Sequence, residues 1–534
     1  MNAKQKFKLF HNGRIQSLDA HSKPANALLV FGNKIAFCGA EHEINLPDYV
    51  TDKFDLLGNY VFPSFTDCHT HVAAVALTTE RVRLDHCQNK QEALDEIHNF
   101  IIRTQPGEWI LGSGWNANIW PEDLPDKSDL DQLSELHPIA LYNKDGHTQW
   151  LNSLALQKCG FDDTISDPSG GKFGRGRDNS LNGLIYEKAC SLVDAIADKT
   201  SYEQLSRCMH KLYPKLHQLG ISGVHSCEGM DIYKIFQTMA INDTLKIRVC
   251  MHPPATGMDR LINAGLHSGT GDIWLRLGGL KYFMDGSLGS QTADLFEPYE
   301  ATTQQGIAVL SEEELYNYSS RAAENGLSAT VHAIGDRAIF KTLNVLTRLS
   351  EINSPVPLRH RIEHSQIMRP TDIDRMGKLN VIASMQPLHI ADDIQLAEKH
   401  LGKRSRYTYP VRSILDAGCR VVFGSDMPIA DPDPLLGMLA AVSRRYKLNP
   451  EESSWYPEQA ITSGEALLAY TREAAFASYE ENLKGTLTPG KLADFIVVDN
   501  DLAHAEERQL RQLKVLMTVI DGTIRYQDQS GSFR

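Results

Sequence analysis

The sequence lacks the features that would place it in a membrane, in a disulfide framework or on nucleic acid. No stretch of 18 apolar residues occurs, which argues against a transmembrane helix. The nine cysteines are scattered, odd in number and without a Cys-x-x-Cys pair, so we expect a reducing, cytoplasmic compartment. No long run of Lys and Arg offsets the formal net charge of −13, which disfavours nucleic acid and anionic membranes as partners.

The composition is otherwise that of an ordinary globular protein. Hydrophobic residues make up 42% of the chain and charged residues 23%, which supplies ample material for a core. A length of 534 residues suits one large domain with a smaller companion. The N-terminal segment carries early lysines with no apolar stretch after them, unlike a secretory signal.

Both ends of the chain read as short β-strands. Near the N-terminus, KLFHNGRIQSL and ALLVFGNKIAFCG alternate apolar and polar residues around turn dipeptides. Near the C-terminus, LADFIVVD is a buried apolar strand and VLMTVIDGTIRY is a hairpin with an Asp-Gly turn. We therefore predict one small β-sandwich domain that both termini build together, from residues 1–60 and 480–534.

The centre of the chain, residues 61–479, alternates short apolar strands with helical segments, which is typical of a parallel α/β fold. Eight such strands match the count of a (β/α)8 TIM barrel, in which functional groups gather at the carboxyl ends of the strands. Far too many residues separate the first strand from the second for an ordinary loop, so we predict an inserted α/β subdomain at about 72–200. The eight candidate strands lie in YVFPSFTDCHTH, GISGVHS, KIRVCMHP, LGGLKYFMDG, LSATVHAIG, RHRIEHSQ, VIASMQP and RVVFGSDMP.

Ionisable residues stand at the predicted strand ends. His69 and His71 lie two residues apart, so both face one side of the first strand and can hold one ion. Taken singly, each such residue is more often structural: a lone His makes a hydrogen bond, and a lone Asp caps a helix. Taken together, their order on separate strands favours a metal site. The remaining members of this set are Lys281, His332, His364 and Asp426.

Longer motifs carry a family resemblance. They include PSFTDCHTH, DGHTQWLNS, GLKYFMDGSLGS, HAIGDRA, RIEHSQI, FGSDMPIADPDPLLG and GTLTPGKLADFIVVD. With these motifs the chain resembles the amidohydrolase superfamily, and within it the YtcJ-like branch (amidohydrolase family 3), which includes N-substituted formamide deformylases. The resemblance implies a metal-dependent hydrolase that uses metal-activated water to cleave a non-peptide carbon–nitrogen bond of a small molecule. An amide, a formamide or a cyclic amide all suit this reading.

The resemblance also implies a role for each site residue. His69 and His71 would bind the more buried ion, and His332 and His364 the more exposed one. Asp426 would bind the buried ion and also act as the catalytic proton shuttle. Lys281 stands where many members carry a carboxylated lysine. Carboxylation would be needed for metal binding, because a free ammonium has no lone pair to offer a metal. The cofactor would be one or two divalent ions per chain, with zinc the first choice.

Substrate contacts are predicted at four positions. His147 in the insertion would reach the site, Trp115 would wall an apolar pocket, and His389 would touch substrate after the seventh strand; for each, a structural role is the alternative. Met427 stands where relatives often have an aromatic residue, and Asn116 where they often have Asp. Both departures concern the substrate and leave the metal set intact.

We expect structural or supporting roles for two further strand-end features. Glu363 is expected to point to the opposite side of its strand from His364. Asp336 and Arg337 follow the fifth strand and are expected either to anchor a loop or to support the metal ligands through hydrogen bonds.

Two other functions stay open at this stage. A mononuclear aminohydrolase, a deaminase, would need no bridging lysine and usually has a catalytic Glu after the fifth strand, where HAIGDRA has none. A non-catalytic barrel scaffold would be expected to lose some ligand position, and all six keep a competent residue type. The expected partner is a small-molecule substrate, and the resemblance suggests a homodimer.

Overall fold

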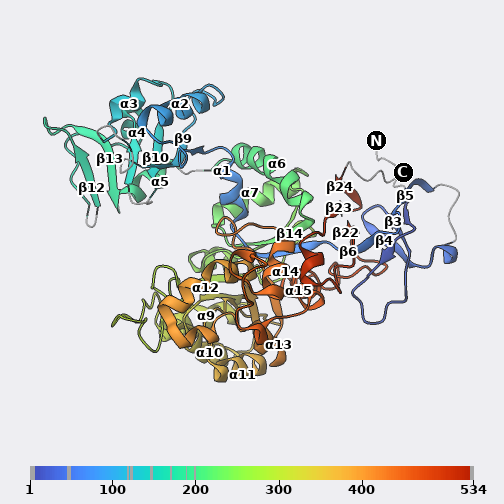
Figure 1. Ribbon diagram of the computed structural model, residues 1–534. Coiled ribbons are helices and arrows are strands. Elements are labelled where there is room, and N and C mark those ends of the chain that lie inside the picture. Colours follow the sequence, from blue (N-terminus) through green and yellow to red (C-terminus); the bar gives the residue numbers. More distant parts are fainter. Residues whose placement is uncertain are drawn as a thin grey trace. The chain divides into compact units, whose positions relative to one another are not determined.

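The computed structural model describes residues 7–44, 50–116, 120, 124–144, 148–168, 171–187, 189–197 and 200–528. The chain is a mixed α/β protein that divides into two compact units. Unit 1 consists of residues 1–73 and 212–534, and unit 2 of residues 74–211 (Figure 1).

Each of the eight predicted segments in unit 1 contains a parallel strand. These eight strands and a ninth, short strand, β16, form two sheets in the orders β16-β15-β14-β7 and β17-β18-β19-β20-β21. Their bounds are β7 (Phe65–Thr70), β14 (Ile221–Ser226), β15 (Arg248–Met251), β16 (Leu275–Leu277), β17 (Gly279–Phe283), β18 (Ser328–Ala333), β19 (Arg361–His364), β20 (Ile382–Met385) and β21 (Val421–Phe423).

Isolated backbone bridges join the two parallel sheets to each other at both ends of the series of parallel strands. Thr70 at the end of β7 forms a parallel bridge with Met427, just beyond β21, and Pro254 forms one with Lys281 of β17. Cys68 of β7 also shares a hydrophobic cluster with Ile382 and Val422 of the other sheet. The carboxyl ends of strands from both sheets therefore meet in one region.

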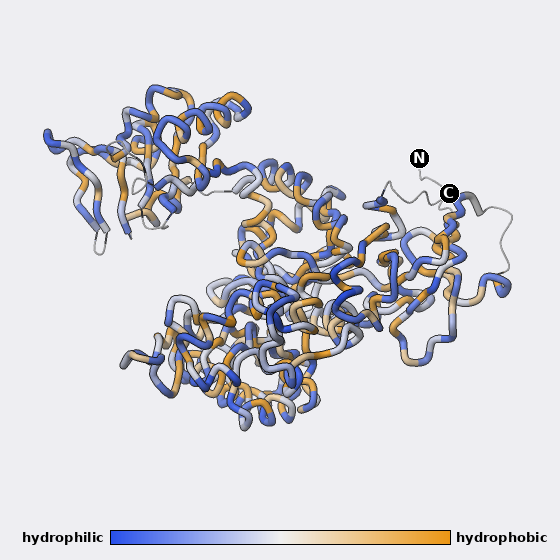
Figure 2. Tube along the Cα trace, viewed as in Figure 1, coloured by the Kyte–Doolittle hydropathy of each residue, from blue (hydrophilic) through white to orange (hydrophobic). Residues whose placement is uncertain are grey.

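Helices connect the parallel strands. Helix α9 begins where the Ser311 hydroxyl accepts from the backbone N–H of Glu314 and the Glu314 carboxylate accepts from Ser311 in return, which satisfies two exposed donors. In Figure 2, orange and blue stretches alternate along these helices, as expected when one face packs on strands and the other meets water. The helices of unit 1 beyond its boundary with unit 2 are α7 (Met230–Ile241), α8 (Met258–Asn263), α9 (Glu312–Glu324), α10 (Asp336–Leu349), α11 (Pro370–Lys378), α12 (Pro387–Leu401), α13 (Val411–Asp416), α14 (Pro434–Ser443), α15 (Ser463–Tyr470), α16 (Arg472–Ala477) and α17 (Glu507–Leu510).

Segments from the two chain ends share one core within unit 1. Figure 1 shows strands β22–β24, in red, beside the blue N-terminal strands. Phe10, Val30, Phe495 and Val519 are among the buried residues of a single hydrophobic cluster. The two sheets have the orders β4 (Lys34–Gly39)-β3 (Ala27–Phe31)-β1 (Phe7–His11)-β5 (Val50–Asp55) and β2 (Arg14–Ile15)-β6 (Tyr60–Pro63)-β22 (Phe495–Val498)-β23 (Val515–Ile520)-β24 (Thr523–Gln527).

The predicted boundary at residue 60 falls at the start of β6. Because β6 pairs with β22, the terminal sheets keep the chain as far as Pro63, and the first parallel strand begins at Phe65. One continuous apolar run, YVFPSF, thus serves two different sheets, and its composition alone does not mark the division.

Unit 2 corresponds to the predicted insertion, with bounds of 74–211 in place of about 72–200. Its Gly-rich stretch forms the antiparallel hairpin β12–β13. The sheet has the order β12 (Gly171–Arg175)-β13 (Leu181–Glu187)-β11 (Thr148–Leu151)-β10 (Ile139–Asn143)-β9 (Ile110–Trp115)-β8 (Val82–Arg83). Its helices are α2 (Lys90–Ile101), α3 (Lys127–Asp131), α4 (Ser153–Lys158) and α5 (Cys190–Ala197), and α1 (Val72–Thr78) and α6 (Tyr202–Gln218) contain the unit boundaries.

Among the described residues, no helix combines the length and the apolar character that crossing a bilayer would require.

A buried ion pair ties the parallel strands of unit 1 to the terminal sheets. The Arg248 guanidinium on β15 donates to both carboxylate oxygens of Asp494, at 2.5 and 2.8 Å, and both side chains are almost fully buried. We expect Arg248→Met to lower the free energy of unfolding by about 3–5 kcal/mol, because it leaves a buried carboxylate without its partner. Urea denaturation followed by near-UV circular dichroism measures this change.

The exposed pair of Arg260 with Asp231, 4.0 Å apart, provides the control. Arg260→Met should change the free energy of unfolding by less than about 0.5 kcal/mol. Equal effects of the two substitutions would show that the buried pair has no special part in joining the sheets.

Candidate functional site

Three predicted ligands from distant parts of the chain form one cluster. His69 lies on β7, His364 ends β19, and Asp426 follows β21. One ligand atom from each lies within 4.8 Å of the other two. Two imidazole nitrogens and a carboxylate oxygen at this spacing are a donor set that suits a divalent ion.

Hydrogen bonds orient His69 of β7 and His71, which directly follows β7, toward Asp426. His71 Nδ1 lies 3.0 Å from the carbonyl oxygen of Cys227, and His69 Nδ1 contacts a carboxylate oxygen of Glu363. Because these oxygens only accept, each Nδ1 carries the proton and each Nε2 keeps its lone pair. Both Nε2 atoms lie 3.5 Å from Asp426 Oδ1, so two ligand atoms converge on one carboxylate.

His332 and Lys281 lie beside this cluster. The ring centroids of His332 and His364 are 4.4 Å apart. His332 Nε2 donates to the carbonyl oxygen of Gly286 at 3.0 Å, which leaves Nδ1 available as a ligand. Lys281 on β17 is only 4% exposed. Its charge acts on His69 and His332, where it lowers their pKa. The structure thus groups His69, His364 and Asp426, with His71 and His332 beside them, whereas Lys281 acts on this group through its charge.

The protonation states suit metal ligands. Burial, with the nearby Lys281 charge, lowers the pKa of His69 and brings the pKa of His332 to about 4. Burial and the His332 charge hold the pKa of His364 well below its ordinary value. For Asp426, burial raises the pKa, but His69 and His71 outweigh burial and lower it. At neutral pH His69, His332 and His364 are therefore neutral and Asp426 is ionised, whereas the hydrogen bond to Asp426 raises the pKa of His71.

The backbone is strained at two of the candidate ligands. His364 and Asp426 are in the left-handed region, with φ of 70° and 59°, and so is Ser365, with φ of 45°. Such conformations cost about 1–3 kcal/mol each and persist only where neighbouring contacts hold them. For the last strand, the carboxylate of Asp67 provides the contact, since it accepts from the backbone N–H and the hydroxyl of Ser425 at 2.9 and 2.5 Å.

The prediction that Glu363 points away from the site is wrong. Its carboxylate accepts from His69 Nδ1, and the side chain is fully buried. The positive φ of His364 explains the error, because it interrupts the strict alternation of side chains that the prediction assumed. Two consecutive residues of β19 therefore both serve the cluster, one as a candidate ligand and the other by orienting His69.

Arg361 completes this buried network and was not singled out from the sequence. Its guanidinium forms an ion pair with Glu363, donates to the carbonyl oxygen of Cys68 at 2.7 Å and to the hydroxyl of Ser384 at 2.6 Å, and lies 3.0 Å from His225 Nδ1. Arg361 therefore keeps Glu363 ionised: its charge outweighs burial and holds the pKa of Glu363 well below the ordinary value. The same guanidinium ties β19 to β7, β14 and β20.

The chain matches the Amidohydrolase family over residues 52–526, which is most of its length. It belongs to the amidohydrolase family. It is 30% identical to the protein LONG AFTER FAR-RED 3 of Arabidopsis thaliana, over 92% of this chain and 87% of the relative. It is 29% identical to the putative amidohydrolase YtcJ of Bacillus subtilis, over 89% and 91% of the two chains. These matches agree with the resemblance to the YtcJ-like branch.

This amidohydrolase is similar to two further proteins over nearly their full lengths. The N-substituted formamide deformylase of Arthrobacter pascens is 27% identical over 98% of both chains. An uncharacterized metal-dependent hydrolase from Pyrococcus furiosus has a structure that aligns with a TM-score of 0.79 and 25% identity, over 93% of this chain and 100% of the other. The family and these neighbours support a metal-dependent hydrolase.

The four predicted substrate contacts have different outcomes. Trp115 is buried in the hydrophobic core of unit 2 with Trp120 and Trp150, and its indole N–H donates to the carbonyl oxygen of Leu141 at 2.7 Å. The prediction that Trp115 forms the wall of a substrate pocket is therefore wrong, and the residue instead packs in the core of unit 2. His147 lies outside the described residues.

Met427 and His389 both lie near the cluster. Met427 is buried, and its carbonyl oxygen accepts from the backbone N–H of His71 at 3.0 Å, so its backbone helps to join β7 to the last strand. His389 lies in the first turn of α12, and its charge is among those that lower the pKa of Asp426. A substrate role for either side chain stays a prediction.

Asp336 and Arg337 anchor a loop, as expected: they bind the loop after β17, in which Asp294 is the partner of Arg337. Arg337 donates to the buried carboxylate of Asp294 at 2.6 Å, and Asp336 accepts from the backbone N–H of Phe296 at 3.0 Å. The buried carboxylate of Asp285 accepts from three backbone N–H groups, including that of Gly335 at 2.7 Å.

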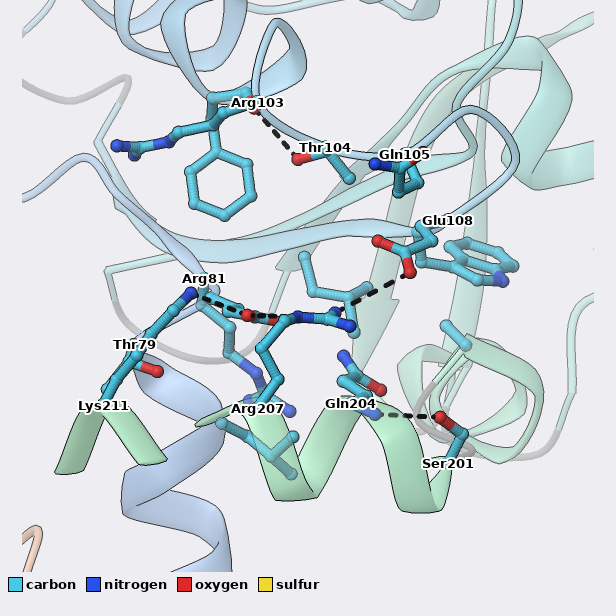
Figure 3. A pocket seen from close by; sticks show the side chains of 16 residues that line it. Thr79, Arg81, Arg103, Thr104, Gln105, Glu108, Ser201, Gln204, Arg207 and Lys211 are labelled. Atoms are coloured by element: carbon cyan, nitrogen blue, oxygen red, sulfur yellow. Dashed lines mark hydrogen bonds and ion pairs between the residues drawn. The ribbon is translucent and has the colours of Figure 1, made fainter. Parts of the chain in front are cut away.

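A cavity of about 500 Å³ in unit 2 contains none of the predicted site residues. Figure 3 shows Arg207 and Gln204 of α6 in this cavity, with Glu108 facing Arg207. The Glu80 carboxylate accepts from Arg207 at 2.8 and 2.9 Å and from Lys211 at 2.7 Å. Burial raises the pKa of Glu80, but these hydrogen bonds outweigh it and bring the pKa to about 2. Arg207 and Lys211 of this cavity are therefore paired with carboxylates of the same cavity.

Close packing of the last strand against β7 can be tested at Gly424. A Cβ at this position would lie 2.3 Å from the backbone nitrogen of His69 and 2.9 Å from Asp67 Oδ1. We expect Gly424→Ala to lower the free energy of unfolding by about 1–3 kcal/mol, because backbone atoms must shift to make room. Thermal denaturation measures the loss. Gly289→Ala, where a Cβ meets nothing within 4 Å, should leave the midpoint almost unchanged.

Proposed function

We propose that this amidohydrolase is a metal-dependent enzyme that hydrolyses a non-peptide carbon–nitrogen bond of a small molecule, such as an amide, a formamide or a cyclic amide. The convergence of His69 Nε2 and His71 Nε2 on Asp426 Oδ1, each at 3.5 Å, is the observation that carries the proposal. The similarity to an N-substituted formamide deformylase supports this bond type.

The residues present fit a divalent ion. The cluster of His69, His364 and Asp426 combines neutral imidazoles with an ionised carboxylate, within reach of one ion. His69, His71 and Asp426 would hold the more buried ion, and His332 and His364 the more exposed one. We propose zinc as the ion. Lys281, as a carbamate formed with carbon dioxide, would supply two further oxygen ligands between them.

The bound ion would lower the pKa of water to about 7 and so provide hydroxide at neutral pH. The carboxylate of Asp426 is ionised and can accept the proton of the attacking water. The water oxygen forms a bond to the carbonyl carbon, and the carbon–nitrogen bond breaks. Asp426 then delivers its proton to the leaving nitrogen, so that the products are a carboxylic acid and an amine.

We further propose the architecture that this chemistry needs. The parallel strands of the eight predicted segments, with the short β16 beside β15, would form a (β/α)8 TIM barrel of residues 61–479, and the two terminal sheets a β-sandwich. Unit 2 would be a subdomain inserted after the first barrel strand. The nine cysteines, all present as free thiols, support a cytoplasmic location, and a homodimer remains our proposal for the assembly.

Metal content and turnover together test the proposed function. Wild-type protein purified without chelator should contain about two ions per chain, and Lys281→Ala one or fewer. Asp426→Asn should reduce hydrolysis of N-formyl and N-acyl amines by about 10²–10⁴-fold, because proton transfer is lost. Elemental analysis and amine release measure the two effects, and Lys215→Ala, an exposed lysine, should keep both ions.

The outcomes separate the alternatives. One ion in both wild type and Lys281→Ala would remove the bridging role and favour a mononuclear hydrolase or a deaminase. Protein without any bound ion would contradict the enzyme and favour a scaffold.

Glu363 provides a test that does not depend on the substrate. Glu363→Gln keeps the shape of the side chain but removes the charge that orients His69, so we expect metal affinity to fall by about 10–100-fold. Competition with a chromophoric chelator measures the affinity. Glu481→Gln is the matched control, because Glu481 also pairs with an arginine, Arg359 at 2.6 Å, but contacts no candidate ligand. Equal affinities in the two variants would refute the orienting role.

A further inference from the structure

A second cavity in unit 1 opens beside the candidate metal ligands. It has a volume of about 650 Å³, which lies within the range of about 300–1,000 Å³ that is typical of small-molecule sites. Lys281 and Phe283 of β17 form one wall, and Val309 and Tyr318 lie among the other lining residues. The cavity is built entirely from residues between 254 and 321 and so lies within a single unit.

Phe283 connects this cavity to the site. Its ring centroid lies 5.5 Å from that of His332 and 5.3 Å from Lys281 Nζ. The same ring lines the cavity and is 45% exposed. A molecule whose reacting carbonyl lies at the candidate ligands could therefore extend over Phe283 into the cavity without leaving the surface of the protein.

The walls of the cavity are apolar where a substrate would pass. Val309 and Tyr318 are 54% and 50% exposed, and together with Phe283 they place three exposed apolar side chains around one cavity. The backbone N–H of Val309 donates to the carbonyl oxygen of Met284 at 2.8 Å, so this wall is held at the end of β17. The charged lining residues Asp259 and Arg321 pair with each other at 2.6 Å, which leaves the apolar surface as the main recognition feature.

We propose that this cavity holds a bulky apolar substituent on the nitrogen of the substrate, so that the enzyme prefers N-aralkyl and long N-alkyl amides to small ones. The inference rests on the proposed function. A formamide carries only hydrogen on its acyl side, so in this substrate class a large group can stand only on nitrogen. Apolar burial adds about fourfold per methylene group to transition-state binding, provided that the cavity receives it.

A series of formamides tests the preference. With wild-type enzyme, kcat/KM should rise at least about tenfold from N-methylformamide to N-phenethylformamide. Val309→Trp, which fills the cavity from an exposed position, should reduce this ratio to within about twofold of unity, because the phenyl group loses its space. Ile241→Trp, on an 84% exposed position of α7 outside the cavity, should keep the wild-type ratio.

Binding without turnover separates failure of this inference from failure of the proposed function. Saturation-transfer NMR with N-phenethylformamide should show contact of its phenyl protons with Asp426→Asn protein and loss of that contact in Asp426→Asn/Val309→Trp. Hydrolysis with a ratio independent of substituent size would overturn the cavity assignment while the proposed function stands. Phenyl contact that Val309→Trp abolishes, without hydrolysis by wild type, would support the cavity and contradict the hydrolase. Neither contact nor hydrolysis would overturn both.

Discussion

Pairing between the first and last parallel strands of unit 1 is the constraint on which the site depends. The backbone N–H of Asp426 donates to the carbonyl oxygen of His69 at 2.7 Å, and the backbone N–H of His71 donates to Met427 at 3.0 Å. Two residues more than 350 positions apart are thereby held as neighbours. Without this pairing, neither histidine would have a carboxylate opposite its free nitrogen.

Several buried groups maintain that pairing against backbone strain. Asp67 accepts two hydrogen bonds from Ser425 and so holds the turn in which Asp426 takes a positive φ. Gly424 allows the last strand to approach β7 closely, because any side chain there would meet the His69 backbone. Left-handed conformations at non-glycine residues are costly, and their presence at the candidate ligands His364 and Asp426 is a common property of functional sites.

Next to the candidate ligands, buried ionisable groups of opposite charge are paired with one another. Glu363 accepts from His69, and Arg361 neutralises Glu363 in a fully buried position. Removing one member of such a pair leaves an uncompensated charge, which links the ligand geometry to the stability of the strands around it. Phe283 lies beside His332, with ring centroids 5.5 Å apart, and also lines an apolar cavity, so the end of β17 joins the candidate ligands to that cavity.

The sequence by itself determined the strands, the strand-end residues and the family, because these depend on local periodicity and on motifs that lie within a few residues. His69 at the end of β7 and His71 just after it lie two residues apart and face the same carboxylate, as simple alternation predicts, and the eight strand segments are apolar runs with polar ends. Only the tertiary structure decided which side chains turn inward. Glu363 joins the cluster because of a positive φ at His364, Arg361 because three other strands surround it, and Trp115 packs into unit 2 because that unit forms its own core. Such contacts join residues that are distant in sequence, and no local pattern encodes them.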